Sequence, residues 1–217
     1  MRHALTTARL ITCLVPGLLA HAANNGPIVP VAAAAPAANP APASPAQRTA
    51  LPRDSIYHLA APLQDQSGRK LMLADKRGRA QIVVMFYTSC KFICPTIIET
   101  VLDLDRRLTA AERARLGVLM ISLDPKHDDA LALKATADKR QLDLTRWTLV
   151  QPRAADLRPI AAVLGVRYRP LDDGEINHTG ALVLLDAEGR IVARSSDTSG
   201  AVTAEFLQRV RALLAKA

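Results

Sequence analysis

The chain has 217 residues, of which 49% are hydrophobic and only 3% are aromatic. This length is ample for one buried core. Because alanine inflates the apolar fraction of the first 50 residues, we expect a single folded domain over residues 51–217 rather than two. The net charge of +8 raises the question of nucleic acid. Basic residues are scattered among acidic ones and no nucleic-acid motif is present, which excludes that class. The charge indicates a solvated basic surface, with an acidic protein or an anionic membrane as the alternative partner.

The first segment of the chain is typical of a secretory signal. Arg2 and Arg9 form a positive region, an apolar stretch follows over residues 10–19, and residues 20–22 (Ala-His-Ala) give an A-x-A cleavage site. We therefore predict that residues 1–23 direct export to the periplasm. An uncleaved inner-membrane anchor is the weaker alternative, because the apolar stretch is shorter than the roughly 20 residues that a spanning helix needs.

Residues 24–50 consist mainly of alanine and proline and show neither strand nor helix periodicity. Proline excludes a regular helix and extends the chain, so we predict a disordered linker. If the signal stays in place, this linker can hold the domain away from a membrane. The alternative is a disordered tail on an otherwise free domain.

The folded part opens with a predicted β-hairpin, residues 55–63 and 70–73, around a polar turn at 64–69. Residues 81–87 (QIVVMFY) form a continuous apolar run, which indicates a strand buried on both faces. Apolar residues then recur at helical spacing up to Leu108. The other predicted elements are a strand at 116–123, a helix at 128–140, a strand at 147–150, a helix capped by Asp156 with Pro159 in its first turn and ended by Gly165, strands at 166–169, 181–185 and 191–194, and a helix at 203–215.

The order of these elements is strand, helix, strand, helix, then a β-hairpin and a final helix. That order predicts an α/β protein with a thioredoxin-like fold, in which a central mixed sheet has flanking helices and an N-terminal β-hairpin.

Two cysteines remain beyond the signal segment, Cys90 and Cys94, and they lie four apart where the strand 81–87 feeds a helix. Cys13 lies within the signal and is treated as a bystander. Pro95 suits a first helical turn. We therefore expect Cys94 at or beside the helix N-cap, where unpaired N–H groups stabilise a thiolate.

Three interpretations of this cysteine pair compete. A structural disulfide would gain little, because a four-residue loop removes little chain entropy. Thiol exchange needs one exposed sulfur of low pKa with a resolving partner nearby. A copper site is the third interpretation, because two thiolates and an imidazole form a donor set that suits both Cu(I) and Cu(II). We favour the copper site.

His178 is the predicted third ligand. It lies in a predicted loop just ahead of the strand 181–185, and in a thioredoxin-like sheet this loop faces the entrance of the first helix. The alternative is an ordinary loop histidine. His127, expected in a solvated loop, and His58, expected at the surface or edge of the opening hairpin, are weaker candidates.

Taken together, these residues resemble the SCO/SenC family of copper-binding, thioredoxin-like proteins linked to assembly of the copper site of cytochrome c oxidase. The resemblance covers roughly residue 55 to the C-terminus. The features that carry it are the hairpin turn at 64–68, the run 87–90 (YTSC) followed by Cys94, Pro95 and Thr96, the run 122–125 (SLDP) followed by Asp128, and His178 ahead of the strand that ends in 185–189 (LDAEG).

The resemblance implies that Cys90, Cys94 and His178 bind copper and that Asp124 lies near the site as an outer group. The family usually has Pro and Asp directly after the first cysteine, whereas this chain has Lys91 and Phe92. A cation beside the sulfurs is expected to favour free thiolate and to disfavour a bound metal ion.

The sequence therefore predicts an exported copper chaperone or thiol reductant that prepares a copper centre in a respiratory enzyme. Its expected partners are the copper-accepting subunit of a respiratory oxidase or reductase and a thiol reductant protein, in the periplasm or at the inner membrane through the N-terminus. The alternative is a thiol:disulfide oxidoreductase that uses Cys90 and Cys94 as its catalytic redox pair without a metal. A metallochaperone is favoured over an enzyme.

Overall fold

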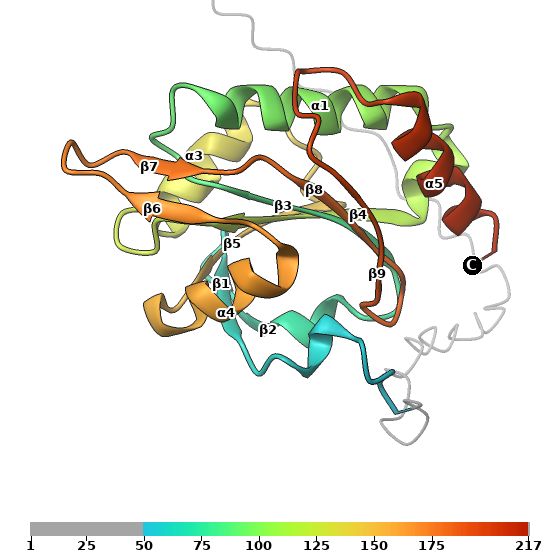
Figure 1. Ribbon diagram of the computed structural model, residues 1–217, viewed down its shortest axis with the longest axis horizontal. Coiled ribbons are helices and arrows are strands. Elements are labelled where there is room, and N and C mark those ends of the chain that lie inside the picture. The colour runs from blue at the N-terminus through green and yellow to red at the C-terminus, as the bar shows by residue number, and fades with distance from the viewer. Residues whose placement is uncertain (1–49, 217) are drawn as a thin grey trace, which may run out of the picture. The chain divides into compact units, whose positions relative to one another are not determined.

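The computed structural model describes residues 50–216. The predicted signal segment, 1–23, and the predicted linker, 24–50 except for its last residue, lie outside the described residues. The described chain forms a seven-stranded sheet in the order β2-β1-β5-β4-β3-β8-β9 and a separate two-stranded sheet, β6-β7 (Figure 1). No helix within residues 50–216 has the length and apolar character needed to cross a bilayer.

The centre of the large sheet is its most buried part. In β3 (Ala80–Phe86) and β4 (Leu116–Ser122) all seven residues are buried. These two strands are parallel, and β4 is also parallel to β5 (Trp147–Pro152). On the other side of β3, the strands β8 (Leu182–Leu185) and β9 (Ile191–Ser195) are antiparallel. The mixed sheet predicted from the sequence is confirmed.

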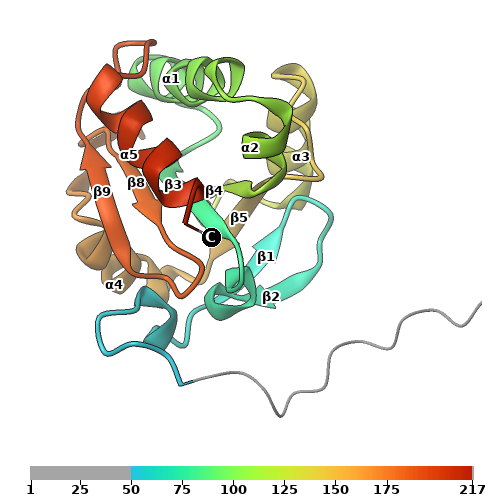
Figure 2. The same ribbon diagram turned by 90° about the vertical axis from the view of Figure 1, so that its right-hand side faces the viewer.

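Helices cover both faces of this sheet (Figures 1 and 2). On one face lie α1 (Ile93–Arg107), α3 (Ala130–Lys139) and α5 (Ala204–Leu214), and on the other lies α4 (Ala154–Leu164). This double cover explains the continuous apolar runs of β3 and β4, since neither face of these strands meets water.

The opening hairpin is present but shorter than predicted. Its strands are β1 (Pro62–Asp65) and β2 (Lys70–Met72), which pair in antiparallel register. The stretch before β1 is the 3-10 helix η2 (Ile56–His58) instead of a strand, because the Ser55 side chain accepts a hydrogen bond from the Tyr57 N–H and closes a turn there. A second 3-10 helix, η3 (Leu73–Lys76), follows β2.

Another difference concerns the start of a helix. The cap predicted at Asp156 is wrong: α4 begins earlier, at Ala154, so that Pro159 lies inside the helix and one backbone hydrogen bond is lost. Asp156 lies in the first turn, where it accepts a hydrogen bond from the Arg153 side chain at 2.5 Å. Gly165 ends the helix as predicted, with a left-handed φ of 73°.

The short helix α2 (Ala110–Ala114) was not predicted. It begins with a capping box, in which Thr109 and Glu112 exchange hydrogen bonds between side chain and backbone. The T-x-x-E spacing is a sequence signal for such a start, and it could have revealed this helix.

Candidate metal centre

The cysteine pair lies at the corner where β3 turns into α1. Cys90 is half-buried in the loop between them, and Cys94 is the second residue of α1 and 2% exposed. The N-cap is Phe92, so Cys94 lies two residues inside the helix and the prediction of Cys94 at or beside the N-cap is off by one residue. Both cysteines are free thiols in this structure.

His178 is brought to this corner by the small sheet. It is the last residue of β7 (Ile176–His178), which pairs in antiparallel register with β6 (Tyr168–Pro170). Its side chain is buried, and Nε2 lies 3.5 Å from the Cys94 Sγ atom. The two sulfur atoms and an imidazole nitrogen all lie within 4.8 Å of one another. The structure therefore gathers the three predicted ligands, although His178 ends a strand and does not lie in a loop.

The imidazole is held in a form that suits a ligand. Its burial lowers the pKa of His178, so the neutral ring is favoured. Nδ1 lies 3.3 Å from the Thr179 carbonyl oxygen, which can accept a hydrogen bond from a protonated Nδ1. With Nδ1 protonated, Nε2 presents its lone pair to the sulfurs. An outer hydrogen bond of this kind commonly fixes the tautomer of a metal-binding histidine.

The two thiols differ in acidity, in the opposite sense to the prediction. Burial raises the pKa of Cys94, and the neighbouring Cys90 raises it further, so Cys94 does not hold the stabilised thiolate. Partial burial opposes ionisation of Cys90, but hydrogen bonds from the Cys94 thiol and from the backbone N–H groups of Cys94 and Phe92 lower its pKa overall. The N–H groups at the start of α1 thus stabilise a thiolate at Cys90, which precedes the helix, and not at Cys94.

A buried carboxylate fixes the loop that leads to Cys90. Asp128 is 1% exposed and accepts hydrogen bonds from the Thr88 N–H, the Thr88 hydroxyl and the Ser122 hydroxyl. Burial raises the pKa of Asp128, against the effect of those hydrogen bonds. Asp124, the outer group implied by the resemblance, instead accepts a hydrogen bond from His127 Nδ1 at 2.8 Å. The acid that supports the cysteine loop is therefore Asp128.

Tyr87 links the corner to the small sheet. Its hydroxyl donates to the Glu175 carboxylate at 2.6 Å and accepts from the Ile176 N–H at 3.3 Å. Its ring meets the His178 ring edge-on, with 5.9 Å between the centroids. Burial and the Glu175 hydrogen bond raise the pKa of Tyr87, so the hydroxyl keeps its proton. No sequence signal pointed to Glu175 because its partner lies 88 residues away.

A hollow of about 330 Å³ opens beside Cys90 and His178. Its apolar part is made by Tyr87, Phe92, Ile93, Leu171 and Ile176. The Phe92 side chain is 75% exposed at this opening, an unusual position for a large apolar residue.

The other candidate residues do not belong to the three-residue cluster. His58 is exposed, with Nε2 2.8 Å from the Pro52 carbonyl oxygen, and the exposed His127 pairs with Asp124. Lys91 is exposed in the loop between the cysteines.

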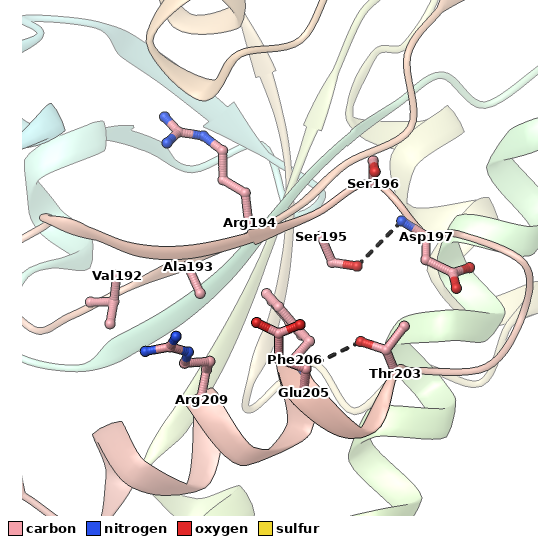
Figure 3. Close-up of a pocket in the computed structure, with 10 residues that line it drawn as sticks. All are labelled: Val192, Ala193, Arg194, Ser195, Ser196, Asp197, Thr203, Glu205, Phe206 and Arg209. Carbon is pink, nitrogen blue, oxygen red and sulfur yellow. Dashed lines mark hydrogen bonds between the residues drawn. The ribbon is translucent and has the colours of Figure 1, made fainter.

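A second hollow, of about 450 Å³, lies between β9 and α5 (Figure 3). Figure 3 shows Glu205, Phe206 and Arg209 rising from α5 toward β9. None of its ten lining residues is a cysteine or a histidine, so it offers none of the donors found at the corner.

The donor set fits a soft, thiophilic metal ion. Two sulfurs and one neutral imidazole are ligands that suit copper and zinc, whereas magnesium and calcium prefer oxygen. The fold and the site together define a thioredoxin-like protein with a cysteine–cysteine–histidine cluster where the first central strand meets its helix.

Comparison with known proteins identifies the family. The sequence model of the SCO1/SenC family matches residues 59–215, so the chain belongs to that family. The "SCO1 protein homolog" of Bacillus subtilis (strain 168) is 22% identical over 132 residues, which cover 59% of this chain and 68% of that protein. The predicted family is thereby confirmed.

Two solved structures show the same fold. A SCO1/SenC family lipoprotein from Bacillus anthracis str. Ames is 19% identical with a TM-score of 0.60, and the match covers 70% of this chain and 91% of that one. Bradyrhizobium japonicum ScoI with copper bound is 22% identical with a TM-score of 0.55, and the match covers 69% of this chain and 96% of that one. The predicted thioredoxin-like fold is confirmed.

Proposed function

We propose that this chain binds copper as cargo through Cys90, Cys94 and His178 and serves in the assembly of a copper centre in a respiratory enzyme such as cytochrome c oxidase. The observation that carries the proposal is the convergence of three donor atoms within 4.8 Å of one another. Membership of the SCO1/SenC family supports copper as the ion. Within that family, a similar protein has been solved with copper bound.

The donors match the two oxidation states of copper differently. Cu(I) is soft and is satisfied by two thiolates, whereas Cu(II) also requires nitrogen or oxygen donors. His178 supplies such a nitrogen at the edge of the sulfur pair. We infer that the cysteines hold Cu(I) and that the imidazole extends the site to Cu(II).

The test is metal content in relation to redox state. Reduced protein, residues 51–217, is expected to bind one copper ion per chain. Protein with a closed Cys90–Cys94 disulfide is expected to bind none, because it has no thiolate to donate. Equal copper uptake by both forms would show that the cysteines are not ligands.

A second function is favoured by the unequal acidity of the two cysteines. In a thiol:disulfide oxidoreductase, the Cys90 thiolate attacks a substrate disulfide and releases one substrate thiolate. Cys94 then gives its proton to that thiolate and attacks the Cys90 sulfur of the mixed disulfide, which releases the second substrate thiolate. Two electrons pass to the substrate and a Cys90–Cys94 disulfide remains. The half-exposed Cys90 with its lowered pKa and the buried Cys94 fit these roles. Reduction of insulin without copper binding at micromolar excess would favour this function.

The place of action is part of the same proposal. We infer export to the periplasm, with the N-terminal segment 1–23 as signal or inner-membrane tether. Fractionation of cells that express the full chain tests this, because a cytoplasmic protein would contradict it. A copper-accepting oxidase or reductase subunit and a thiol reductant protein are the expected partners.

A further inference from the structure

The small sheet that holds His178 is tied to the domain by few polar contacts. Within residues 50–216, two polar links join the strands β6 and β7 to the large sheet and α1. One is the Tyr87 hydroxyl, and the other is the Cys94–His178 contact. The remaining hydrogen bonds of β6 and β7 run within the hairpin and its base, as from the Leu171 N–H to the Glu175 carbonyl oxygen. The Tyr87 hydroxyl therefore makes one of the two polar links that can fix the position of His178.

We propose that Tyr87 is a positioning residue that sets how firmly His178 is presented to the cysteines. Its hydroxyl holds Glu175 and Ile176, three and two residues before His178, while its ring packs against the imidazole. We call the two hydrogen bonds of the Tyr87 hydroxyl, one donated to the Glu175 carboxylate and one accepted from the Ile176 N–H, the Tyr87 latch. The proposal rests on the proposed function, because it assigns to the latch a role at the copper site.

The geometry explains why the hydroxyl matters. Tyr87 directly follows β3, is 3% exposed and lies three residues before Cys90, so it moves with the rigid corner. Glu175 and Ile176 are only half-buried and belong to a hairpin with three paired positions. A hydroxyl–carboxylate hydrogen bond is stronger than one between neutral groups. The latch thus joins a rigid element to a weakly held one at the point nearest the imidazole.

The latch predicts an effect that depends on oxidation state. Loss of the hydroxyl removes one of several groups that lower the pKa of Cys90 but leaves both sulfurs in place, so Cu(I) binding is retained. Cu(II) needs the imidazole, so its binding weakens when His178 samples other positions.

Tyr87→Phe tests the proposal because it keeps the ring and removes only the hydroxyl. In the metal-free reduced protein we expect hydrogen exchange at the Ile176 and His178 amides to speed up by about tenfold, the factor that corresponds to about 1.4 kcal/mol. Amides of β3 and β4 should exchange as in the wild type. In the copper-loaded protein we expect about tenfold weaker Cu(II) binding, again equivalent to about 1.4 kcal/mol, and a shifted sulfur-to-copper charge-transfer band.

Three further variants separate the latch from general damage. Glu175→Gln keeps an oxygen acceptor for the Tyr87 hydroxyl and should restore most of the wild-type behaviour, whereas Glu175→Ala should reproduce Tyr87→Phe. Tyr168→Phe removes a hydroxyl from the neighbouring strand β6, where it makes no hydrogen bond within the described residues. That control should change neither exchange nor the copper spectrum.

The outcomes distinguish the latch from the copper function. Unchanged exchange in Tyr87→Phe overturns the latch whether or not copper binds. Faster exchange with unchanged Cu(II) affinity shows that His178 holds its own position, which overturns the positioning role. If the wild type binds no copper, the proposed function fails, and NMR of the His178 imidazole then decides the latch. Broadened or shifted ring signals in Tyr87→Phe support it, and identical signals overturn it.

Discussion

The two halves of the candidate site are held in different ways. The cysteine corner continues β3, a strand paired on both sides by β4 and β8 and buried along its whole length. The histidine ends β7, which belongs to a two-stranded sheet of three paired positions outside the large sheet. The sulfurs are thus fixed by the core of the domain, and the imidazole by a hairpin. Affinity for Cu(II) can therefore change at the hairpin while the fold and the sulfur pair stay the same.

The largest expected effect comes from the corner itself. Cys90→Ser or Cys94→Ser leaves one thiolate, and a hydroxyl is a poor ligand for Cu(I). We expect copper binding by the reduced protein to fall below detection in each variant, with little change in secondary structure. Copper quantified after gel filtration, alongside circular dichroism, measures both properties. A variant that keeps one copper ion per chain would contradict the role of that sulfur.

The second-largest expected effect tests the part of the site that the hairpin holds, His178. His178→Ala should weaken Cu(II) by more than the roughly 10–100-fold that loss of an outer hydrogen-bond partner costs. Cu(I) should lose far less, because both thiolates remain. The charge-transfer absorption of the Cu(II) form and competition titrations for each oxidation state provide the measurement. His58→Ala and His127→Ala are the matched controls, and an unaltered Cu(II) spectrum in His178→Ala would remove the third ligand.

The part of the site that the core holds, the cysteine corner, was predictable from the sequence. The runs 81–87 and 116–123 are apolar except for Gln81 and Ser122, and such runs indicate burial on both faces from local composition alone. The spacing of Cys90 and Cys94 was equally local. His178 was found only by assuming a topology, because it lies 84 residues from Cys94.

What remained hidden depends on packing between distant segments. The Tyr87–Glu175 hydrogen bond joins residues 88 apart, and neither residue carries a local signal for it. The acidity of the cysteines was assigned to the wrong residue, because helix-start reasoning favours a thiolate at Cys94 but does not weigh its burial. The role of Asp128 at the cysteine loop was not predicted, whereas the placement of Asp124 near the site as an outer group stays a prediction.

Asp128→Ala tests whether the corner is fixed by the core. The substitution removes the acceptor for the Thr88 N–H, the Thr88 hydroxyl and the Ser122 hydroxyl. Buried donors left without partners cost on the order of 3 kcal/mol in total. Chemical denaturation should show that loss in the free energy of unfolding.

Asp124→Ala is the control for Asp128→Ala. Asp124 is half-buried and pairs with the exposed His127, so its loss should cost below about 1 kcal/mol. Equal destabilisation by the two variants would contradict the assignment of Asp128 as the acid that holds the cysteine loop.

The smallest expected effect comes from a substitution at Gly180, where the chain that follows His178 passes close to the start of α1. A Cβ atom added at Gly180 would stand 2.7 Å from the Thr198 Oγ1 atom and 3.1 Å from the Ile93 Cδ1 atom, at the start of α1. Gly180→Ala should therefore push the chain after His178 away from the corner. Overpacking of this kind costs about 1–2 kcal/mol of unfolding free energy.

The same displacement should affect the binding of Cu(I) and of Cu(II) to different extents. Because Gly180 is two residues after His178 and Ile93 is next to Cys94, Gly180→Ala should lower Cu(II) affinity more than Cu(I) affinity. Adding Thr198→Ala removes the Oγ1 atom and the nearby Cγ2 atom that the new methyl meets. The double variant should recover most of the stability and of the Cu(II) spectrum, since the closest contact no longer exists and only that with the Ile93 side chain remains. If the losses of the two single substitutions simply add in the double variant, the contact between residues 180 and 198 does not displace the hairpin. Other contacts would then determine the distance between His178 and the cysteines.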